Sequence, residues 1–300
     1  KLTNKQKAKL YISSTILISL YIDFILTTKL YIKYPNILVT ILFSILTLVP
    51  ITEIVIKTIN YILGKIQRPK LLPKIEFEKE LPKEAATFVV IPSIVKSKEK
   101  VIELLRKLEV YYLANRLDNI YFALLGDCSE EQESETEFDE EIMKTGLEKT
   151  QKLNEKYGEN KFFFLYRKRT WNDCEQAYIG WERKRGLLAT FNLYIKNKIQ
   201  NNFAINTIES IKNELPEIKY VITLDSDTNL SLGSAGLLIG AMEHILNKPI
   251  IEDRKVIDGY GIMQPRIGLD LGLSKKSLFI EYYSMQGGVD LYSNAISDLY

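Results

Sequence analysis

The stretch Tyr220-Val-Ile-Thr-Leu-Asp-Ser-Asp-Thr-Asn229 predicts both the fold of the chain and the place of its chemistry. It starts as an apolar run rich in β-branched residues and stops at two carboxylates, Asp225 and Asp227. This pattern predicts a buried parallel strand that carries both acids to its C-terminal end. Because ligands bind at that edge of open α/β sheets, we expect the two acids to lie in a binding site.

Two carboxylates separated by one residue can share a hard divalent cation. Mg²⁺ and Mn²⁺ prefer oxygen ligands and keep water molecules that the phosphate oxygens of a substrate can replace. Nucleotide-sugar transferases use an Asp-X-Asp arrangement of this kind. A strand that ends in a polar turn gives the same pattern, so Asp225 and Asp227 alone do not separate the two interpretations.

Two apolar stretches near the N-terminus predict a transmembrane hairpin. Residues 10–26 and 37–56 each approach the roughly 20 residues that cross a bilayer, and the polar segment 27–36 separates them. Asp23 and Glu53 interrupt the two stretches, and a buried or interfacial helix pair is the alternative. We expect no cleavable signal peptide, because the second apolar stretch follows the first at once.

Basic residues flank this predicted hairpin unevenly, which places both of its ends in the cytoplasm by the positive-inside rule. The chain that follows is then cytoplasmic. Lysines 1, 5, 7 and 9 precede the hairpin, Lys65, Arg68, Lys70 and Lys74 follow it, and the connection holds Lys29 and Lys33.

The composition excludes several classes of function. A formal net charge of +2 provides no field that would favour nucleic acid. Cys128 and Cys174 lie far apart without a pairing pattern, which indicates reduced thiols. The single histidine, His244, has no neighbouring ligands and makes no metal site.

After a linker over residues 66–86, which mixes prolines with charged residues, the pattern predicts a mostly parallel α/β sheet with flanking helices over residues 87–300. The expected strands are 87–93, 120–127, 161–166, the stretch at 220 and 255–266, and the expected helices are 98–115, 142–156, 187–198, 207–215 and 235–246. The acidic run 129–141 is interpreted as a solvated loop.

A basic segment follows the third predicted strand. Residues 167–172 and 181–187 hold arginines, lysines and both tryptophans of the chain. Arginine forks suit the oxygens of a diphosphate, which makes Arg167, Lys184 and Arg185 candidate donor-binding residues. The alternative is a solvated basic face with the tryptophans filling the core under it.

Taken together, these blocks resemble the glycosyltransferase region of the cyclic β-1,2-glucan synthases, which are large bacterial inner-membrane proteins of the processive GT-A type. The likeness covers residues 87–300. It rests on Ile91-Pro-Ser93, Leu108-Glu-Val-Tyr-Tyr-Leu-Ala-Asn115, Trp171-Asn172, Gly180-Trp-Glu-Arg-Lys-Arg-Gly186, Thr223-Leu-Asp-Ser-Asp-Thr228, Gly259-Tyr-Gly-Ile-Met-Gln-Pro-Arg266 and Ala295-Ile-Ser-Asp-Leu-Tyr300.

The resemblance implies an inverting, metal-dependent transferase that moves glucose from UDP-glucose to a growing β-1,2-glucan. It implies Ser93 and Asp127 beside the uridine, Lys184 or Arg185 at the diphosphate, Asp225 and Asp227 on Mg²⁺ or Mn²⁺, and Gln264 on the donor or acceptor side. Two departures are the acidic run 129–141, which has no counterpart, and the family's later acid motif, which does not occur before Tyr300.

Inversion requires a base for the acceptor hydroxyl, and we expect that acid beyond Tyr300, so that the chain is an N-terminal fragment of something longer. Two other classes keep the same motif. In a HAD-type phosphohydrolase an Asp-X-Asp motif also comes after an apolar strand. That motif, however, has Thr or Val at the position of Asn229, and it lies on the first strand of the core, whereas here three predicted strands precede it. A non-catalytic membrane scaffold that retains a nucleotide-sugar fold is the second alternative.

Overall fold

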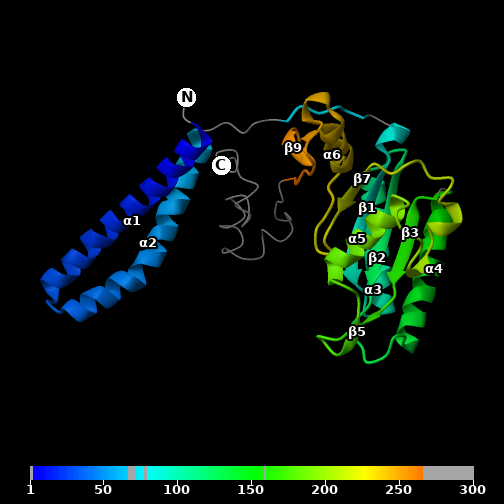
Figure 1. Cartoon of the computed structure of the whole chain (residues 1–300), viewed down its shortest axis with the longest axis horizontal. Coiled ribbons are helices and arrows are strands. Elements are labelled where there is room, and N and C mark those ends of the chain that lie inside the picture. Colours follow the sequence, from blue (N-terminus) through cyan, green and yellow to red (C-terminus); the bar gives the residue numbers. More distant parts are fainter. Residues whose placement is uncertain (1–2, 67–71, 78–79, 159, 266–300) are drawn as a thin grey trace. The chain divides into compact units, whose positions relative to one another are not determined.

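The computed structural model describes residues 3–66, 72–77, 80–158 and 160–265 (Figure 1). The chain divides into two compact units. One contains residues 1–72 and 262–300, and the other, here called the globular unit, is Pro73–Gly261. Each is described by itself. The expected motif at Ala295–Tyr300 lies outside the described residues.

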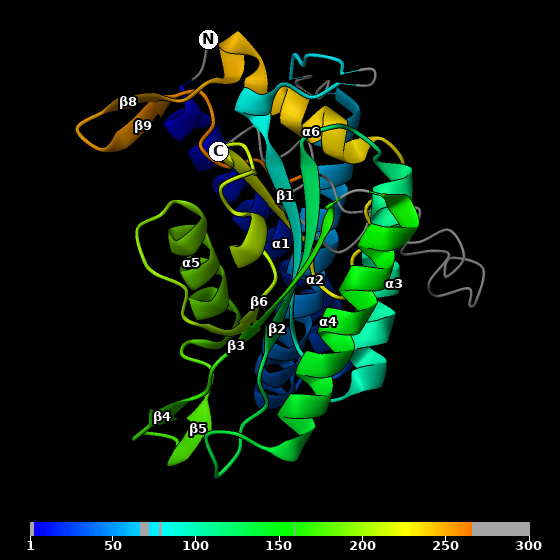
Figure 2. The same ribbon diagram turned by 90° about the vertical axis from the view of Figure 1, so that its right-hand side faces the viewer.

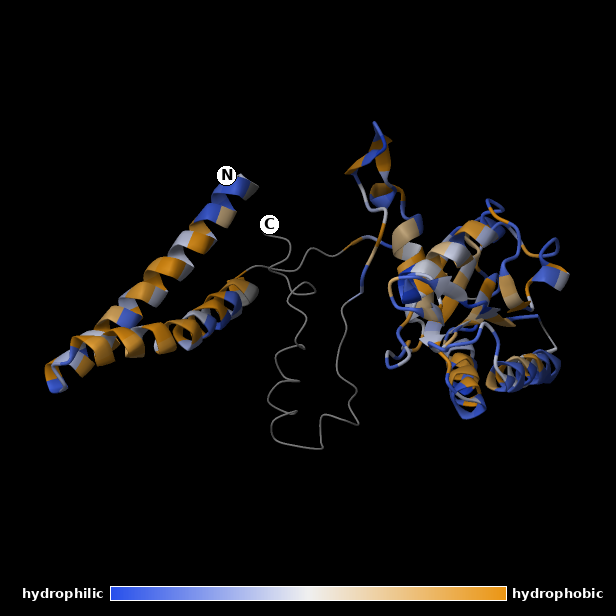
Figure 3. Ribbon diagram, turned by 60° about the horizontal axis from the view of Figure 1, so that its bottom comes forward, coloured by the Kyte–Doolittle hydropathy of each residue, from blue (hydrophilic) through white to orange (hydrophobic). Residues whose placement is uncertain are grey.

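The N-terminal unit is a helical hairpin of α1 (Asn4–Lys33) and α2 (Ile37–Ile66), each of 30 residues. Both helices are long and apolar enough to cross a membrane, over Lys5–Lys33 and Ile37–Leu63. In Figure 3 apolar residues cover α2 along nearly its whole length, whereas α1 is more mixed. The two predicted apolar stretches therefore lie inside two continuous helices.

Polar side chains link the two helices. Asp23 of α1 is buried, and its carboxylate accepts hydrogen bonds from the hydroxyl groups of Ser44 and Thr47 on α2, the latter at 2.8 Å. The Tyr11 hydroxyl group donates to Asn60 at 2.8 Å. Hydrogen bonds of this kind stabilise helix pairs where water is absent. In the sequence, Asp23 argued against a membrane span in α1. In the structure, its side chain points at the partner helix α2.

The globular unit is built on a five-stranded sheet in the order β6-β3-β2-β1-β7. β1 pairs in parallel with β2 and β7, β2 pairs in parallel with β3, and β6 is antiparallel to β3. The mostly parallel α/β fold preceded by a helical hairpin is therefore confirmed. The bounds are β1 Thr87–Ile94, β2 Ile120–Asp127, β3 Phe162–Arg167, β6 Phe203–Asn206 and β7 Tyr220–Thr223.

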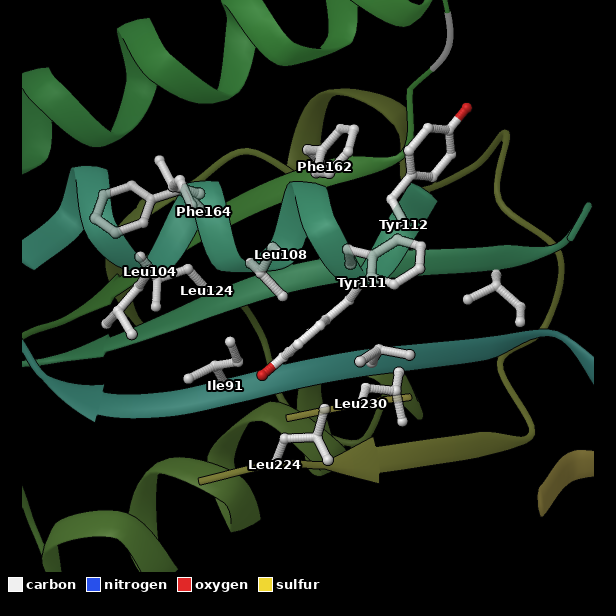
Figure 4. Packing of buried hydrophobic residues seen from close by; sticks show 14 of the residues in the cluster. Ile91, Leu104, Leu108, Tyr111, Tyr112, Leu124, Phe162, Phe164, Leu224 and Leu230 are labelled. Atoms are coloured by element: carbon white, nitrogen blue, oxygen red, sulfur yellow. The ribbon is translucent and has the colours of Figure 1, made fainter. Parts of the chain in front are cut away.

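Helices cover both faces of this sheet, with α3 and α4 on one face and α5 on the other (Figure 2). On the first face Leu108 and Tyr112 of α3 pack with Phe162 and Phe164, as the close view of Figure 4 shows. On the second face Phe191 of α5 packs on the strands. The helices are α3 Lys98–Ala114, α4 Glu137–Tyr157, α5 Arg183–Ile195 and α6 Ser234–Glu243.

β7 differs from its prediction in burial. We expected a strand buried on both sides, and the structure gives a half-buried one, because among the described residues β7 is an edge strand paired only with β1. The expected strand 255–266 shortens to β9 (Lys255–Asp258), which pairs with β8 (Ile250–Glu252) in a separate two-stranded sheet.

The segment after α5 also differs. The expected helix 207–215 is only a 3₁₀ turn, η2 (Glu209–Ile211), and the short strand β6 before it was not predicted. Thr207 explains both differences, because its backbone and its side chain are bonded to β3. Its N–H donates to the Phe164 carbonyl at 3.1 Å, and its hydroxyl accepts from the Phe164 N–H at 2.9 Å. Pairing with β3 therefore uses the residue that would have begun the helix.

Part of the expected linker packs on the globular unit. Leu81, Ala85 and Ala86 are buried, and the η1 turn (Lys83–Ala85) leads directly into β1. The Ile75 N–H donates to the Gly240 carbonyl of α6 at 3.0 Å. The globular unit thus begins at Pro73, before its first strand.

Gly146 of α4 allows close packing on β3, which gives a stability prediction. An added Cβ would lie 2.2 Å from the Phe164 ring. Gly146→Ala should lower the free energy of unfolding by about 1–3 kcal/mol through overpacking, although alanine favours helix by about 1 kcal/mol. Thermal unfolding measures the change.

Gly236→Ala is the matched control, since this helical glycine is also buried but its added Cβ meets only the Leu117 Cδ1 atom, at 3.1 Å. That variant should be as stable as wild type or more stable. Equal losses in both variants would contradict the packing argument.

Candidate active site

The carboxyl ends of the parallel strands meet at one edge of the sheet. Ile94 of β1 is in register with Asp127 of β2, and Val90 of β1 with Thr223 of β7. Ser93, Asp127 and the residues after Thr223 therefore lie at this edge. Arg167, the last residue of β3, joins them, since β2 and β3 also run in parallel.

The segment after β7, residues 225–231, is called the acidic loop, and one face of α3 holds its backbone. The Lys107 ammonium group donates to the Ser226 carbonyl at 2.7 Å, and the Tyr111 hydroxyl donates to the Thr228 carbonyl. One turn further along, the Asn115 amide donates to the Ser231 carbonyl at 3.2 Å. These three side chains are four residues apart, which places them on one stripe of the helix.

The end of α3 also sets the start of α6. The side-chain Oδ1 atom of Asn115 accepts from the Ala235 N–H, and the Gly233 N–H donates to the Ala114 carbonyl, both at 2.9 Å. Gly233 has φ 69°, a left-handed conformation that suits glycine. The acidic loop is thus tethered along its length to a helix of the core.

Within the acidic loop both carboxylates face solvent. Asp225 and Asp227 are exposed, and Asp225 forms an ion pair with Lys184 of α5. Burial lowers the pKa of Lys107, while the nearby Asp227 acts in the opposite direction. Two exposed carboxylates on a held backbone fit a hard cation that keeps several waters. In the part of the chain that the structure describes, no three acidic, histidine or cysteine residues gather as a fuller metal cluster.

Asp127 and Arg167 form a buried bidentate ion pair beside this loop. Arg167 Nε donates to Asp127 Oδ1 at 3.0 Å and Nη2 donates to Oδ2 at 2.7 Å. Arg167 also donates to the carbonyls of Trp181 at 2.8 Å and Arg183 at 3.0 Å. An added Cβ at Gly180 would lie 2.2 Å from both members of the pair, so only glycine fits there. The pair therefore shapes the turn at which α5 begins.

That turn is compact and basic. Glu182 and Arg183 adopt positive φ angles of 48° and 49°, and an added Cβ at Gly186 would lie 1.9 Å from the Trp181 carbonyl. Trp181 is 55% exposed and the other tryptophan, Trp171, is 46% exposed. The alternative in which both tryptophans fill the core is therefore wrong.

A second buried ion pair joins Arg169 to Asp139 at the start of α4. Asp139 also accepts from the Tyr166 hydroxyl at 2.6 Å and the Thr136 hydroxyl at 2.7 Å. Burial alone would raise the pKa of Asp139, but these hydrogen bonds and Arg169 outweigh burial and lower it. Asp139 belongs to the run 129–141 that we interpreted as a solvated loop before a helix at Ile142, but α4 begins at Glu137, so that interpretation is wrong for residues 137–141.

Four of the predicted site residues lie in two pairs, and Asp227 is exposed in the acidic loop. Lys184 meets Asp225, and Asp127 meets Arg167, so the structure brings two pairs together. Ser93 is half-buried at the end of β1.

Two other predicted residues stand apart from these pairs. Arg185 is exposed, pairs with Glu182 and lies 6.0 Å from the Trp181 ring centre. Gln264 is exposed and lies outside the globular unit.

Sequence reasoning missed the residues that hold the site. Its one available signal was a polar stripe at a spacing of four, Lys107, Tyr111 and the C-cap residue Asn115, along one side of α3. Asp139 and Arg169 gave no separate signal, because both stand among residues of like charge.

Tyr111 offers a test of the α3 contact. Its hydroxyl donates to the acidic loop, and burial raises its pKa to about 12. Tyr111→Phe removes this hydrogen bond and keeps the ring. Amides of residues 225–231 should then exchange hydrogen faster, and the free energy of unfolding should fall by about 1 kcal/mol.

Tyr112→Phe is the control, because the buried Tyr112 hydroxyl has no hydrogen-bond partner among the described residues. It should leave exchange in the acidic loop unchanged. Hydrogen exchange read by mass spectrometry compares the two. Equal protection of the loop in wild type and Tyr111→Phe would show that this hydrogen bond does not hold it.

Comparison with known proteins supports an assignment to a family. No established family profile matches the chain. The chain is 34% identical over 258 residues to the cyclic β-(1,2)-glucan synthase NdvB of Rhizobium meliloti (strain 1021), a match that covers 84% of this chain and 9% of that protein. The chain thus spans about a tenth of the length of this relative. On this identity over most of its length, the chain belongs to the cyclic β-1,2-glucan synthase family.

Proposed function

We propose that this chain carries the donor-binding part of a membrane-bound, inverting glycosyltransferase of the GT-A type, which transfers glucose from UDP-glucose to a growing β-1,2-glucan. The observation that carries the proposal is the acidic loop. Asp225 and Asp227 are exposed at the carboxyl edge of a parallel sheet, on a backbone held by α3 and beside the basic turn of α5. The relationship to NdvB, itself named a glucan synthase, supports the reaction class.

The charges at this edge suit a nucleotide diphosphate. Lys184 lies on the first turn of α5 and Arg185 next to it, and backbone N–H groups at a helix start add a positive field. Lys184 would exchange its contact with Asp225 for the diphosphate oxygens. Ser93, at the end of β1, would lie on the uridine side.

The sequence predicted that Asp127 and Arg167 contact the donor, but in the structure their charged groups bind each other. Both carboxylate oxygens of Asp127 accept from Arg167 in a buried pair, with side chains 2% and 6% exposed. We therefore propose that they act on the donor by shaping the turn from Gly180 to Arg183, against which the donor would lie. Gln264 lies outside the globular unit and is not part of the proposed site.

Mg²⁺ or Mn²⁺ would be held by Asp225 and Asp227. When bound, such an ion supplies Lewis-acid stabilisation of the negative charge that develops on the leaving diphosphate. The chain's own residues would present the carboxylates to the ion, orient the diphosphate and hold the acidic loop in one position. Inversion also needs a base for the acceptor hydroxyl, and since both loop acids serve the cation, we place the base outside the acidic loop.

The acids of the loop test the proposal directly. Asp225→Asn and Asp227→Asn should each reduce metal-dependent binding of UDP by at least about tenfold, because an amide is a weaker ligand than a carboxylate for a hard cation. Their unfolding temperatures should stay close to that of wild type, since both side chains are exposed. Isothermal titration calorimetry with Mn²⁺ and UDP measures the affinity.

Asp253→Asn, in the exposed turn between β8 and β9, is the matched control. It should bind UDP like wild type. Normal Mn²⁺-dependent UDP binding by both loop variants would overturn the proposed metal site.

The proposed topology has both ends of the hairpin and the globular unit in the cytoplasm, where UDP-glucose is made. The native Cys174 is exposed and reports on the globular unit. In intact cells a membrane-impermeant thiol reagent should not label it until the cells are permeabilised.

A cysteine at Asn36, between α1 and α2, in a Cys174→Ser background should be labelled from outside. The buried Cys128 serves as an internal negative control. Labelling of Cys174 in intact cells would reverse the proposed orientation.

A further inference from the structure

Two lysines from opposite faces of the sheet bracket the acidic loop. Lys184 belongs to α5, on one face, and forms an ion pair with Asp225. Lys107 belongs to α3, on the other face, and donates to the carbonyl of Ser226, the residue between the two acids, at 2.7 Å. The two acids therefore already have cationic neighbours supplied by the chain.

The two lysines differ in how firmly they are held. Lys107 is half-buried, packed beside the core residues of α3, and its carbonyl partner belongs to a loop with further contacts to the same helix. The side chains of Lys184 and Asp225 are 49% and 58% exposed. A surface ion pair of this kind exchanges partners at little cost. Lys107 is thus a fixed charge and Lys184 an exchangeable one.

Neighbouring basic residues do not neutralise Asp225 and Asp227, because they have acidic partners of their own. Arg183 pairs with Glu130 at 3.1 Å and with Glu175 at 3.3 Å, and Arg185 pairs with Glu182. For the acidic loop itself, the two carboxylates of Asp225 and Asp227 contribute −2 and the two lysines +2, so the sum is zero.

This balance distinguishes a bare divalent cation from one that carries a diphosphate. A bare cation has to displace Lys184 from Asp225 and leaves both lysines beside a doubly positive ion. A cation that brings a nucleotide diphosphate carries at least two negative charges with it, two in a nucleotide sugar and about three in UDP, so it adds no positive charge. The displaced Lys184 then has phosphate oxygens as its new partners.

We propose that Lys107 and Lys184 make this site select a divalent cation together with a diphosphate over the cation alone. This inference rests on the proposed function and specifies the form in which the donor is bound. Cation and diphosphate should then bind with positive coupling, and by linkage each raises the affinity of the other by the same factor.

The test measures binding of Mn²⁺ by electron paramagnetic resonance, with and without UDP, on the whole chain in detergent. In wild type, UDP should raise the affinity for Mn²⁺ by at least about tenfold. Lys184→Met should tighten binding of Mn²⁺ alone by about fivefold, the effect of one unit charge a few ångströms away in a solvated site, and should shrink the UDP enhancement. Lys184→Arg, which keeps the charge, should behave like wild type.

Lys107→Met should act in the same direction on Mn²⁺ alone, and Lys107→Arg should restore wild-type coupling. Two lysines away from the loop provide controls, Lys98→Met in the first turn of α3, which breaks a pair with Glu141, and Lys196→Met at the C-terminal cap of α5, which breaks a pair with Glu217. Neither should change Mn²⁺ affinity. Thermal unfolding of each variant separates a charge effect from a loss of structure.

The outcomes separate this inference from the proposed function. If wild type binds Mn²⁺ and UDP but Lys184→Met leaves both the Mn²⁺ affinity and the UDP enhancement unchanged, the lysine balance is wrong and the donor site stands. If wild type binds neither Mn²⁺ nor UDP, the proposed donor site itself falls, and the inference with it. Tighter binding of Mn²⁺ by Lys184→Met together with weaker UDP enhancement supports both.

Discussion

The buried ion pair between Asp127 and Arg167 is the interaction on which the edge of this sheet depends. Taking two charges out of water costs several kcal/mol per ion, which only good geometry and further hydrogen bonds offset. Here the pair is bidentate, and Arg167 places its remaining donors on the carbonyls of Trp181 and Arg183. Removal of one partner would leave the other charged and buried, a loss of about 3–5 kcal/mol. The start of α5, and with it Lys184, is positioned by this pair.

A second constraint acts from the opposite face. The stripe of Lys107, Tyr111 and Asn115 ties the backbone of the acidic loop to α3, whose buried side chains form part of the core. The loop therefore inherits the rigidity of a core helix although its carboxylates stay exposed. A scaffold of this kind keeps a binding loop in one conformation before any ligand arrives, which lowers the entropy lost on binding.

The sequence could predict the elements whose pattern is local. The apolar run at Tyr220, the alternation of strands and helices, and the two apolar stretches each produce a periodic signal, and the structure places elements there. It could not predict features set by pairing between distant segments. The edge position of β7, the strand β6 drawn to Phe164, and the burial of Asp139 all depend on which strands become neighbours. The roles of Lys107 and Tyr111 were hidden for the same reason, since their partners lie more than a hundred residues away in the sequence.

The buried Asp23 of the hairpin has a consequence for the membrane topology proposed above. On an isolated α1 its carboxylate would face hydrocarbon, which costs about 2.5–3.5 kcal/mol on insertion scales. Its hydrogen-bond partners, Ser44 and Thr47, are supplied only by α2. In the proposed topology, α1 would therefore gain its full stability in lipid only after the thirty residues of α2 have folded back on it, and the two helices would enter the bilayer as a pair.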